Sequence, residues 1–274
     1  MRIIGENING TIPRIRDLIL EHDGKALVDL AVRQVEAGAD VVDINVGTGE
    51  GTAEDEIQDI QWLVGLVKEA TGAGLCIDSA DVRVLRAGLE AGGESAALVN
   101  SVKATEENMA EVMPLVGEAG LPVVALAMDA SGIPRDAASR LRACEKLLRG
   151  AEEHGVPAGN IYFDPLVMPV STDITGGKTT LETLAGIKRE FPGARTVLAL
   201  SNVSFGLPRR GLVNQAMLHM AQYLEVDALI VNPLQGDLML SVQAGEALLG
   251  RDRHCRRYAR AARRAAERRE KVHG

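Results

Sequence analysis

The feature that most constrains the fold of this chain is a repeated alternation of short apolar segments with longer amphipathic ones. The short segments are rich in Val, Ile and Leu and lack the polar alternation of a half-exposed strand. Continuous runs of this kind are typical of parallel strands that are buried on both faces. We therefore predict eight β-strands, at Arg2–Gly5, Val41–Asn45, Leu75–Asp78, Ala96–Asn100, Val123–Met128, Ile161–Pro165, Val197–Ser201 and Ala228–Asn232.

The segments between the predicted strands have helical patterns. In residues 25–40, Leu27, Leu30, Ala31 and Val35 share one face, and Gly38 ends the pattern. Residues 54–72 begin with acidic side chains, which the positive end of a helix dipole favours. Eight strand–helix units over about 250 residues predict an α/β fold, a single-domain (β/α)8 TIM barrel at residues 1–250. A doubly wound open sheet is the alternative, because strand order is not visible in a sequence.

Composition agrees with a soluble globular domain. The chain has 274 residues, of which 46% are hydrophobic and 25% charged. No apolar run is long enough for a membrane span of about 18 residues, and the first residues do not resemble a signal peptide. Cys76, Cys144 and Cys255 form no CxxC pair, so we expect a cytoplasmic protein without a structural zinc site.

Charge is distributed unevenly along the chain. Residues 251–274 contain ten basic and three acidic residues, whereas the other 250 contain 20 and 35. An acidic body is a poor nucleic-acid binder, so neither nucleic acid nor membrane is expected as a partner. The basic Ala/Arg-rich segment is predicted to be a C-terminal helix or tail. It is either a solvated terminal helix or a docking surface for an acidic partner.

Polar residues gather at the carboxyl ends of the predicted strands, which face the active site in a barrel. They are Glu6, Asn7, Asn9, Asp43, Asn45, Asp78, Asn100, Asp129, Asp164, Ser201, Asn202 and Asn232. Asp and Asn also favour turns and helix N-caps, which explains any single position. Their repetition on the last residues of many strands favours a shared site instead.

The composition of this set predicts what it binds. Carboxylates and amides supply acceptors and amide donors that suit the edge of a flat polar heterocycle. The set contains no histidine, and the interleaved asparagines make a metal site unconvincing, so no metal is predicted. The chain has no GxGxxG, GxxxxGK[ST] or GxSxG motif, and Cys76 has no strand-end histidine as a partner.

The phrases IIGENING, DINVG, CIDS, LVNS, YFDPL and LALSNVSFGLPRRGLVNQ resemble the pterin-binding methyltransferases. More narrowly, over about residues 1–250 the chain resembles the methyltetrahydrofolate:corrinoid-protein methyltransferases of anaerobic one-carbon metabolism. The resemblance implies a (β/α)8 barrel that forms a homodimer. It also implies tetrahydrofolate or 5-methyltetrahydrofolate as the substrate and a corrinoid (cobalamin) as the other reactant.

The resemblance assigns roles to individual residues. Asp78, Asn100 and Asp164 would hold the pterin ring, and Asn202 would be the catalytic residue beside N5, which carries the methyl group. Arg210 would meet the folate tail, and Asp43, Asn9 and Ser201 complete the predicted substrate-binding set. Phe205 stands where some relatives have a polar residue, so no side-chain polar contact is expected there.

The implied reaction is methyl transfer by displacement, helped by a hydrogen bond from Asn202 that strengthens as charge grows on N5. The chain lacks the DxHxxG phrase of corrinoid-binding modules, since DRHCRR has Arg257 at the glycine position. The corrinoid is therefore expected on a separate partner protein that docks over the barrel mouth. The direction of transfer is left open.

Two other functions are compatible with a pterin-binding barrel. A dihydropteroate synthase would require a lysine on strand seven and an arginine-bearing phosphate loop after strand two. The chain has SNVS and the acidic GTGEG at these places. The third possibility is a non-catalytic folate-binding barrel, against which the complete polar set and Asn202 argue.

Overall fold

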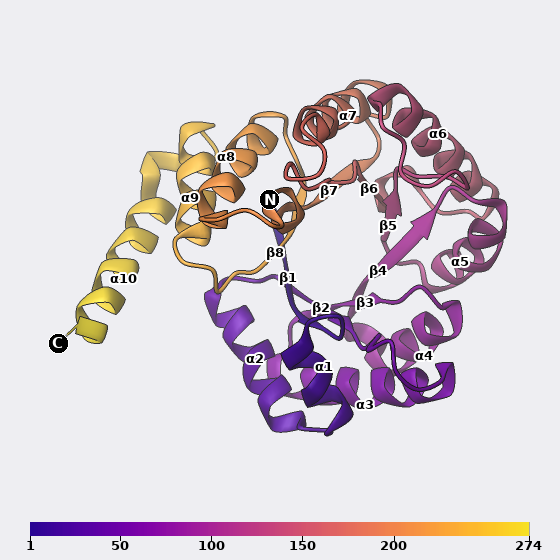
Figure 1. Ribbon diagram of the computed structural model, residues 1–274, viewed down its shortest axis with the longest axis horizontal. Coiled ribbons are helices and arrows are strands. Elements are labelled where there is room, and N and C mark those ends of the chain that lie inside the picture. The colour runs from indigo at the N-terminus through magenta and orange to yellow at the C-terminus, as the bar shows by residue number, and fades with distance from the viewer. Residues whose placement is uncertain (274) are drawn as a thin grey trace.

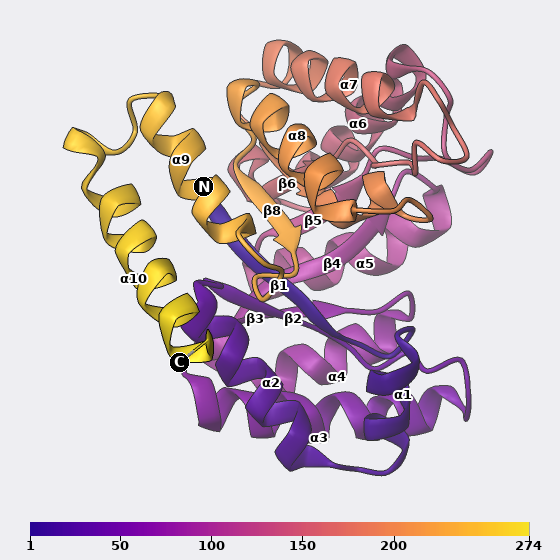
Figure 2. The same cartoon turned by 60° about the vertical axis from the view of Figure 1, so that its left-hand side comes forward.

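The computed structural model describes residues 1–273 and shows a closed barrel of eight parallel strands in chain order (Figure 1). The strands are β1 (Arg2–Asn9), β2 (Val41–Asn45), β3 (Gly74–Asp78), β4 (Ala96–Lys103), β5 (Val123–Leu126), β6 (Ile161–Asp164), β7 (Arg195–Ala199) and β8 (Ala228–Val231). β8 pairs with β1, with Ile230 opposite Ile4, and Figure 2 shows the two strands side by side. The (β/α)8 barrel prediction is confirmed, and the open doubly wound sheet is wrong.

All helices except the last surround the strands as an outer ring (Figure 1), and the helices are named here in chain order. They are α1 (Pro13–Leu20), α2 (Gly24–Ala37), α3 (Ala53–Thr71), α4 (Val82–Gly92), α5 (Glu106–Ala119), α6 (Ala137–Glu153), α7 (Gly176–Glu190), α8 (Arg210–Tyr223), α9 (Leu238–Leu248) and α10 (Arg256–His273). Short 3-10 helices lie at η1 (Gly93–Ser95), η2 (Ala158–Asn160), η3 (Leu200–Ser204) and η4 (Arg253–Cys255).

The helix ends follow from local chemistry. At the start of α3, Thr52 and Asp55 form a reciprocal capping box, which satisfies backbone N–H groups that have no partner inside the helix. α2 ends at Gly38, whose φ of 112° is in the left-handed region that glycine adopts without a Cβ penalty. The helical patterns of residues 25–40 and 54–72 are confirmed as helices.

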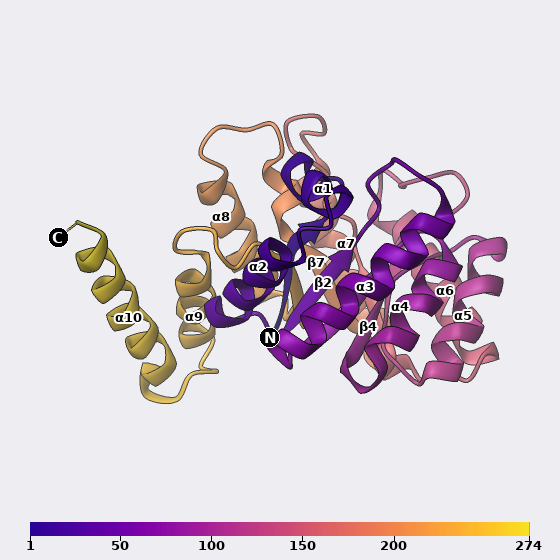
Figure 3. The same ribbon diagram turned by 90° about the horizontal axis from the view of Figure 1, so that it is seen from below.

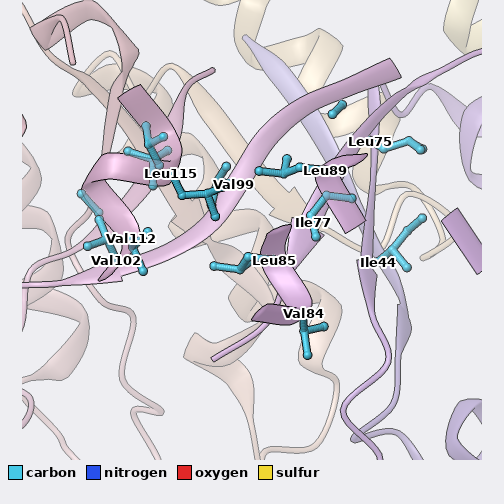
Figure 4. Packing of buried hydrophobic residues seen from close by; sticks show 14 of the residues in the cluster. Ile44, Leu75, Ile77, Val84, Leu85, Leu89, Val99, Val102, Val112 and Leu115 are labelled. Atoms are coloured by element: carbon cyan, nitrogen blue, oxygen red, sulfur yellow. The ribbon is translucent and has the colours of Figure 1, made fainter. Parts of the chain in front are cut away.

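The barrel has apolar layers on both sides of its wall, as the continuous apolar strands require. The outer layer lies between strands and helices, where Ile77 and Val99 pack against Leu85 and Leu89 of α4 and Leu115 of α5 (Figure 4). The inner layer fills the barrel interior and draws on every strand: Ile4, Val41, Cys76, Leu98, Val124, Tyr162, Val197, Ala228 and Ile230. Its members form a packed floor beneath the carboxyl ends of the strands.

α2 differs from its apolar pattern at one position. Leu27 and Ala31 are buried as expected, but the third buried residue is Gln34 rather than Val35. The Gln34 Oε1 atom accepts a 3.0 Å hydrogen bond from the backbone N–H of Asn7. The polar side chain is therefore buried because it provides an acceptor for a strand that is irregular at this point.

Strand seven ends earlier than the sequence predicts. β7 stops at Ala199, and Ser201 lies on the 3-10 helix η3 rather than on the strand. The expectation that the strand extends to Ser201 is therefore wrong. Ala199, with φ −75° and ψ 79°, leaves the extended region, and the chain then turns across the end of the barrel.

The basic segment ends in α10, which stands outside the ring of helices and beside α9 (Figure 3). Within this segment Asp252 caps the start of α10, because its carboxylate accepts hydrogen bonds from the N–H groups of Arg257 and Tyr258. Within the described residues, no helix is long and apolar enough to cross a membrane.

Candidate active site at the mouth of the barrel

Polar side chains form a layer directly above the apolar floor. Closure of the barrel brings together Glu6 from β1, Asp43 and Asn45 from β2, Asp78 from β3, Asn100 from β4 and Asp164 from β6. Ser201 and Asn202 follow β7, and Asn232 follows β8. The barrel therefore places these residues of the predicted set at one end of the molecule.

Asp43, Asp78 and Asn100 form one connected group on adjacent strands. Asp78 is directly opposite Asn100 in the β3–β4 pairing. The Asn100 Nδ2 group donates a 3.3 Å hydrogen bond to Asp43 Oδ1. The three side chains thus hold one another above the floor.

Asp43 and Asp78 are interacting carboxyl groups, and burial raises the pKa of both. Burial and the negative charge of Asp78 raise the pKa of Asp43 well above its usual range. Burial raises the pKa of Asp78 to about 6, while hydrogen bonds from Asn45 and Asp43 limit the increase. The hydrogen bond from Asp43 therefore favours the charged form of Asp78.

Asp164 is the second buried acceptor of the mouth and is only 5% exposed. Its Oδ1 atom accepts a 2.8 Å hydrogen bond from the backbone N–H of Leu166. Burial raises the pKa of Asp164 to about 6, and the Leu166 N–H and the charge of Arg140 counteract part of that increase. The carboxyl group is therefore largely ionised near neutral pH, with Oδ2 available to a ligand.

Arg140 is a site residue that the sequence analysis missed. It lies on the buried face of α6 and is 1% exposed. Its guanidinium donates to the carbonyls of Pro134, Pro165 and Leu166 at 2.9, 2.6 and 2.7 Å. The sequence does indicate that Arg140 is buried, because it lies three and four residues before Ala143 and Cys144, on the apolar face of the helix.

Asn202 and its neighbours lie on η3. Asn202 is exposed, and its side chain makes no hydrogen bond within the described residues, so both amide groups are free to contact a ligand. The preceding residue, Ser201, donates from Oγ to Glu6 Oε1 at 2.6 Å. The sequence indicates Glu6 only as a strand-end residue, because its contact with a residue 195 positions away depends on barrel closure.

Two predicted binding residues make local contacts. Asn9 Oδ1 accepts hydrogen bonds from the backbone N–H and the hydroxyl of Thr11, at 3.0 and 2.6 Å, so it caps a turn. Arg210 donates from Nη2 to the Ser201 carbonyl at 2.7 Å and from Nε to Ser204 Oγ at 3.0 Å. Its Nη1 group has no hydrogen-bond partner within the described residues, so this group is free to make the predicted contact with a folate tail.

The mouth presents side chains whose chemistry suits a polar heterocycle. Within the described residues, no group of three or more His, Cys, Asp or Glu side chains is arranged to hold a metal ion. The available groups are ionised carboxylates and primary amides. They match a flat ring that presents adjacent N–H donors and a carbonyl acceptor.

Sequence comparisons connect the chain to known proteins. A family model described as pterin binding enzyme matches residues 6–232. A methylcorrinoid:tetrahydrofolate methyltransferase of Eubacterium limosum is 34% identical over 263 residues, which cover 95% of this chain and 96% of the relative. A methionine synthase of Mycobacterium tuberculosis is 31% identical over 244 residues, 84% of this chain but 20% of the relative.

Solved structures share the same barrel. A Yersinia pestis dihydropteroate synthase bound to a pterine-sulfa conjugate has a TM-score of 0.71 at 18% identity, covering 91% of this chain and 94% of the other. A dihydropteroate synthase of Xanthomonas albilineans in complex with 7,8-dihydropteroate has a TM-score of 0.71 at 21% identity, covering 90% and 93%. At these identities the likeness concerns the fold.

Proposed function

The chain belongs to the pterin-binding enzyme family, and from this premise we propose that it transfers a methyl group between N5 of tetrahydrofolate and the cobalt of a corrinoid. The observation that carries the proposal is the polar mouth. Ionised Asp164 and Asp78, with the amide of Asn100, lie above a closed apolar floor, as a buried pterin edge requires. The near full-length relative from Eubacterium limosum bears the name of this activity.

In the proposed complex, Asp164 accepts from the N–H donors of the pterin ring through its free Oδ2 atom. Asp78 and Asn100 supply a second acceptor and an amide on the opposite wall, and Asp43 holds Asp78 from below. A carboxylate that accepts hydrogen bonds from a ligand fixes the plane of the ring as well as binding it. The methyl group on N5 is then directed toward the open end of the barrel.

Asn202 is the proposed catalytic residue. When methyl leaves N5, the bonding electron pair stays on nitrogen, and the negative charge that develops is relieved by a proton. An amide donor held near N5 stabilises that charge more in the transition state than in the ground state. Asn202 does not release a proton itself, so the proton comes from solvent. In the reverse direction N5 loses that proton and its pair takes up the methyl group.

The second reactant is a corrinoid that a separate protein carries to the mouth. Because the methyl group passes directly between the two reactants, the partner covers the open end of the barrel during transfer. The name of the Eubacterium limosum relative gives methylcorrinoid first, which favours methylation of tetrahydrofolate. The same residues serve both directions.

The proposal is tested by assaying both directions without oxygen. The purified chain is given 5-methyltetrahydrofolate with cob(I)alamin, and in parallel tetrahydrofolate with methylcob(III)alamin. We expect spectral conversion of the corrinoid in at least one direction. Pterin binding without transfer would support the non-catalytic barrel. Formation of dihydropteroate from a pterin pyrophosphate and p-aminobenzoate would support the synthase alternative.

We also propose that two copies of the chain form a homodimer through the outer face of α8. Leu212, Met220 and Tyr223 lie along one face of this helix and are 55%, 47% and 76% exposed, although outer helix faces of a barrel are usually polar. Light scattering is expected to give twice the chain mass. Met220→Glu with Tyr223→Glu should give the single-chain mass, whereas Leu248→Glu, an exposed leucine on α9, should not.

The remaining expectations concern place and organisation. We propose that the protein acts in the cytoplasm, where the free Cys76, Cys144 and Cys255 stay reduced. We propose that residues 1–250 form the catalytic barrel and that residues 251–274 are a basic appendage. The position of α10 outside the helical ring supports this division (Figure 3).

A further inference from the structure

Glu6 enters the mouth because β1 is irregular. The β1–β2 register shifts between Gly5 and Ile8, which marks a bulge. Gln34 of α2 accepts the Asn7 N–H that the bulge frees. A Cβ on Gly5 would lie 2.5 Å from Gln34 Oε1, so glycine leaves room for this contact. The bulge and its acceptor thus define where the Glu6 side chain points.

The carboxyl group of Glu6 joins three strand ends. It accepts the 2.6 Å hydrogen bond from Ser201 Oγ, after β7, and another from the backbone N–H of Asn232, after β8. Burial raises the pKa of Glu6, while Ser201, Arg210 and the Asn232 N–H oppose the increase. Glu6 itself belongs to β1, so its side chain links β7, β8 and β1 where the barrel closes.

Arg210 holds the same turn from the other side. Its guanidinium donates to the Ser201 carbonyl and to Ser204 Oγ, and its positive charge acts on Glu6. Ser201 is therefore fixed at two points, the hydroxyl by Glu6 and the carbonyl by Arg210. Within the described residues Asn202 has no side-chain hydrogen bond, so its orientation depends on the backbone of Ser201.

We propose that Glu6 is a positioning residue, which orients the Asn202 amide by anchoring Ser201 through its hydroxyl. The inference rests on the proposed function for its kinetic consequence but not for the anchoring itself. In this proposal Glu6 acts on the reaction only through Ser201 and Asn202, so its effect should appear in the rate of transfer rather than in pterin affinity. Its effect should also require Asn202.

The kinetic test is a double-mutant cycle for methyl transfer between 5-methyltetrahydrofolate and cob(I)alamin. We expect Glu6→Ala to lower kcat at least about tenfold, with the dissociation constant of tetrahydrofolate changed less than about threefold. Adding Glu6→Ala to Asn202→Ala should change kcat little, because the group being positioned is already absent. Equal reductions in both backgrounds would overturn the proposal, as would an unchanged kcat in the single variant.

Glu6→Gln is the conservative variant. Its amide oxygen can still accept from Ser201 Oγ, so we expect part of the lost kcat to return relative to Glu6→Ala. Glu56→Ala is the matched control, because Glu56 is a partly buried carboxyl group on α3 whose pKa burial also raises, and it has no hydrogen bond to η3. It should retain the wild-type kcat.

Hydrogen exchange separates this proposal from the proposed function. In Glu6→Ala, amide exchange of residues 201–207 should accelerate, because the 3-10 hydrogen bonds of Phe205 and Leu207 lose their anchor, while the β2–β4 amides keep wild-type exchange. Faster exchange in a protein that transfers no methyl would uphold the anchoring and reject the function. Wild-type exchange in an active protein would reject the anchoring alone.

Discussion

Buried carboxyl groups at the mouth are retained although they destabilise the unliganded protein. Asp164 and Asp78 each have a pKa of about 6, because the surrounding protein disfavours the charged form more than the local hydrogen bonds favour it. Buried charges of this kind are characteristic of functional sites. A ligand that donates hydrogen bonds to them restores part of the solvation lost on folding.

Asp164→Asn should weaken tetrahydrofolate binding while the local structure around residue 164 is retained. The Asn side chain can still accept from the Leu166 N–H, but it replaces the free oxygen with a donor that opposes the N–H groups of a pterin. We expect the dissociation constant of tetrahydrofolate to rise about tenfold to a hundredfold, the loss of one charged hydrogen bond. Calorimetry measures this dissociation constant, and Asp17→Asn at an exposed position is the control. Wild-type affinity in Asp164→Asn would contradict the proposed contact between Asp164 and the pterin.

Asn202→Ala should slow transfer with a smaller effect on binding. The amide stabilises charge that appears on N5 only during the reaction, so its loss acts on kcat. We expect a reduction of at least about tenfold, or roughly 1.4 kcal/mol of transition-state stabilisation. Single-turnover transfer rates and tetrahydrofolate titrations give the two quantities. An unchanged rate would remove Asn202 from the mechanism.

At the level of elements, the irregular parts of the barrel position Glu6 and Asn202, the proposed positioning and catalytic residues. The bulge in β1 aims Glu6, and η3 at the end of β7 presents Asn202. Regular parts hold these features in place through close packing between helices and strands. Gly88 of α4 is one such contact, because a Cβ there would lie 2.5 Å from Ile77 Cγ2, next to Asp78 on β3.

Two helical glycines provide a matched pair of substitutions. Gly88→Ala should destabilise the protein by about 1–3 kcal/mol, because the methyl group overpacks the α4–β3 contact. Gly65→Ala on α3 meets nothing within 4 Å and should stabilise by about 0.5–1 kcal/mol through helix propensity. Urea unfolding of both variants measures the difference, and destabilisation of equal size would argue against a packing cause.

For the whole molecule, pH should act on stability and on binding in opposite directions. The pKa of Asp164 rises from 3.8 to about 6 on folding, so the native state binds more protons than the unfolded state between these values. Its contribution is therefore favourable in acid and is lost as pH rises toward 6. Tetrahydrofolate binding requires the ionised form, so affinity should fall as pH decreases below about 6.

The comparison of wild type with Asp164→Asn isolates this residue from other titrating groups. The unfolding free energy of the variant minus that of wild type should increase from pH 4 to pH 7, by about 3 kcal/mol or less. Denaturant unfolding at several pH values measures the difference. A difference that stays constant with pH would show that Asp164 has an ordinary pKa.

The overall architecture was accessible from sequence because it depends on short-range patterns. Val41 faces the barrel floor and Val42 the helices, so both must be apolar, and that continuous run is visible without a structure. The capped start of α3 and the glycine after α2 are equally local. Residues at the strand ends were recognisable for the same reason, since each follows directly from its strand.

Contacts between residues far apart in the chain could not be predicted from sequence patterns. Gln34 and Arg140 lie on apolar helix faces, but the carbonyls and N–H groups that justify their burial belong to other elements. The turn that moves Ser201 off β7 is stabilised by Glu6 and Arg210, and the Glu6 contact joins residues 195 positions apart in the chain.

The sequence by itself determined the eight strand–helix units and the polar residues at their ends, because burial on two faces and helix periodicity are local properties. Only the tertiary structure decided that β8 closes on β1. This closure brings separate strand ends together, where burial raises the pKa of Asp78 and Glu6 accepts a hydrogen bond from Ser201 beside Asn202.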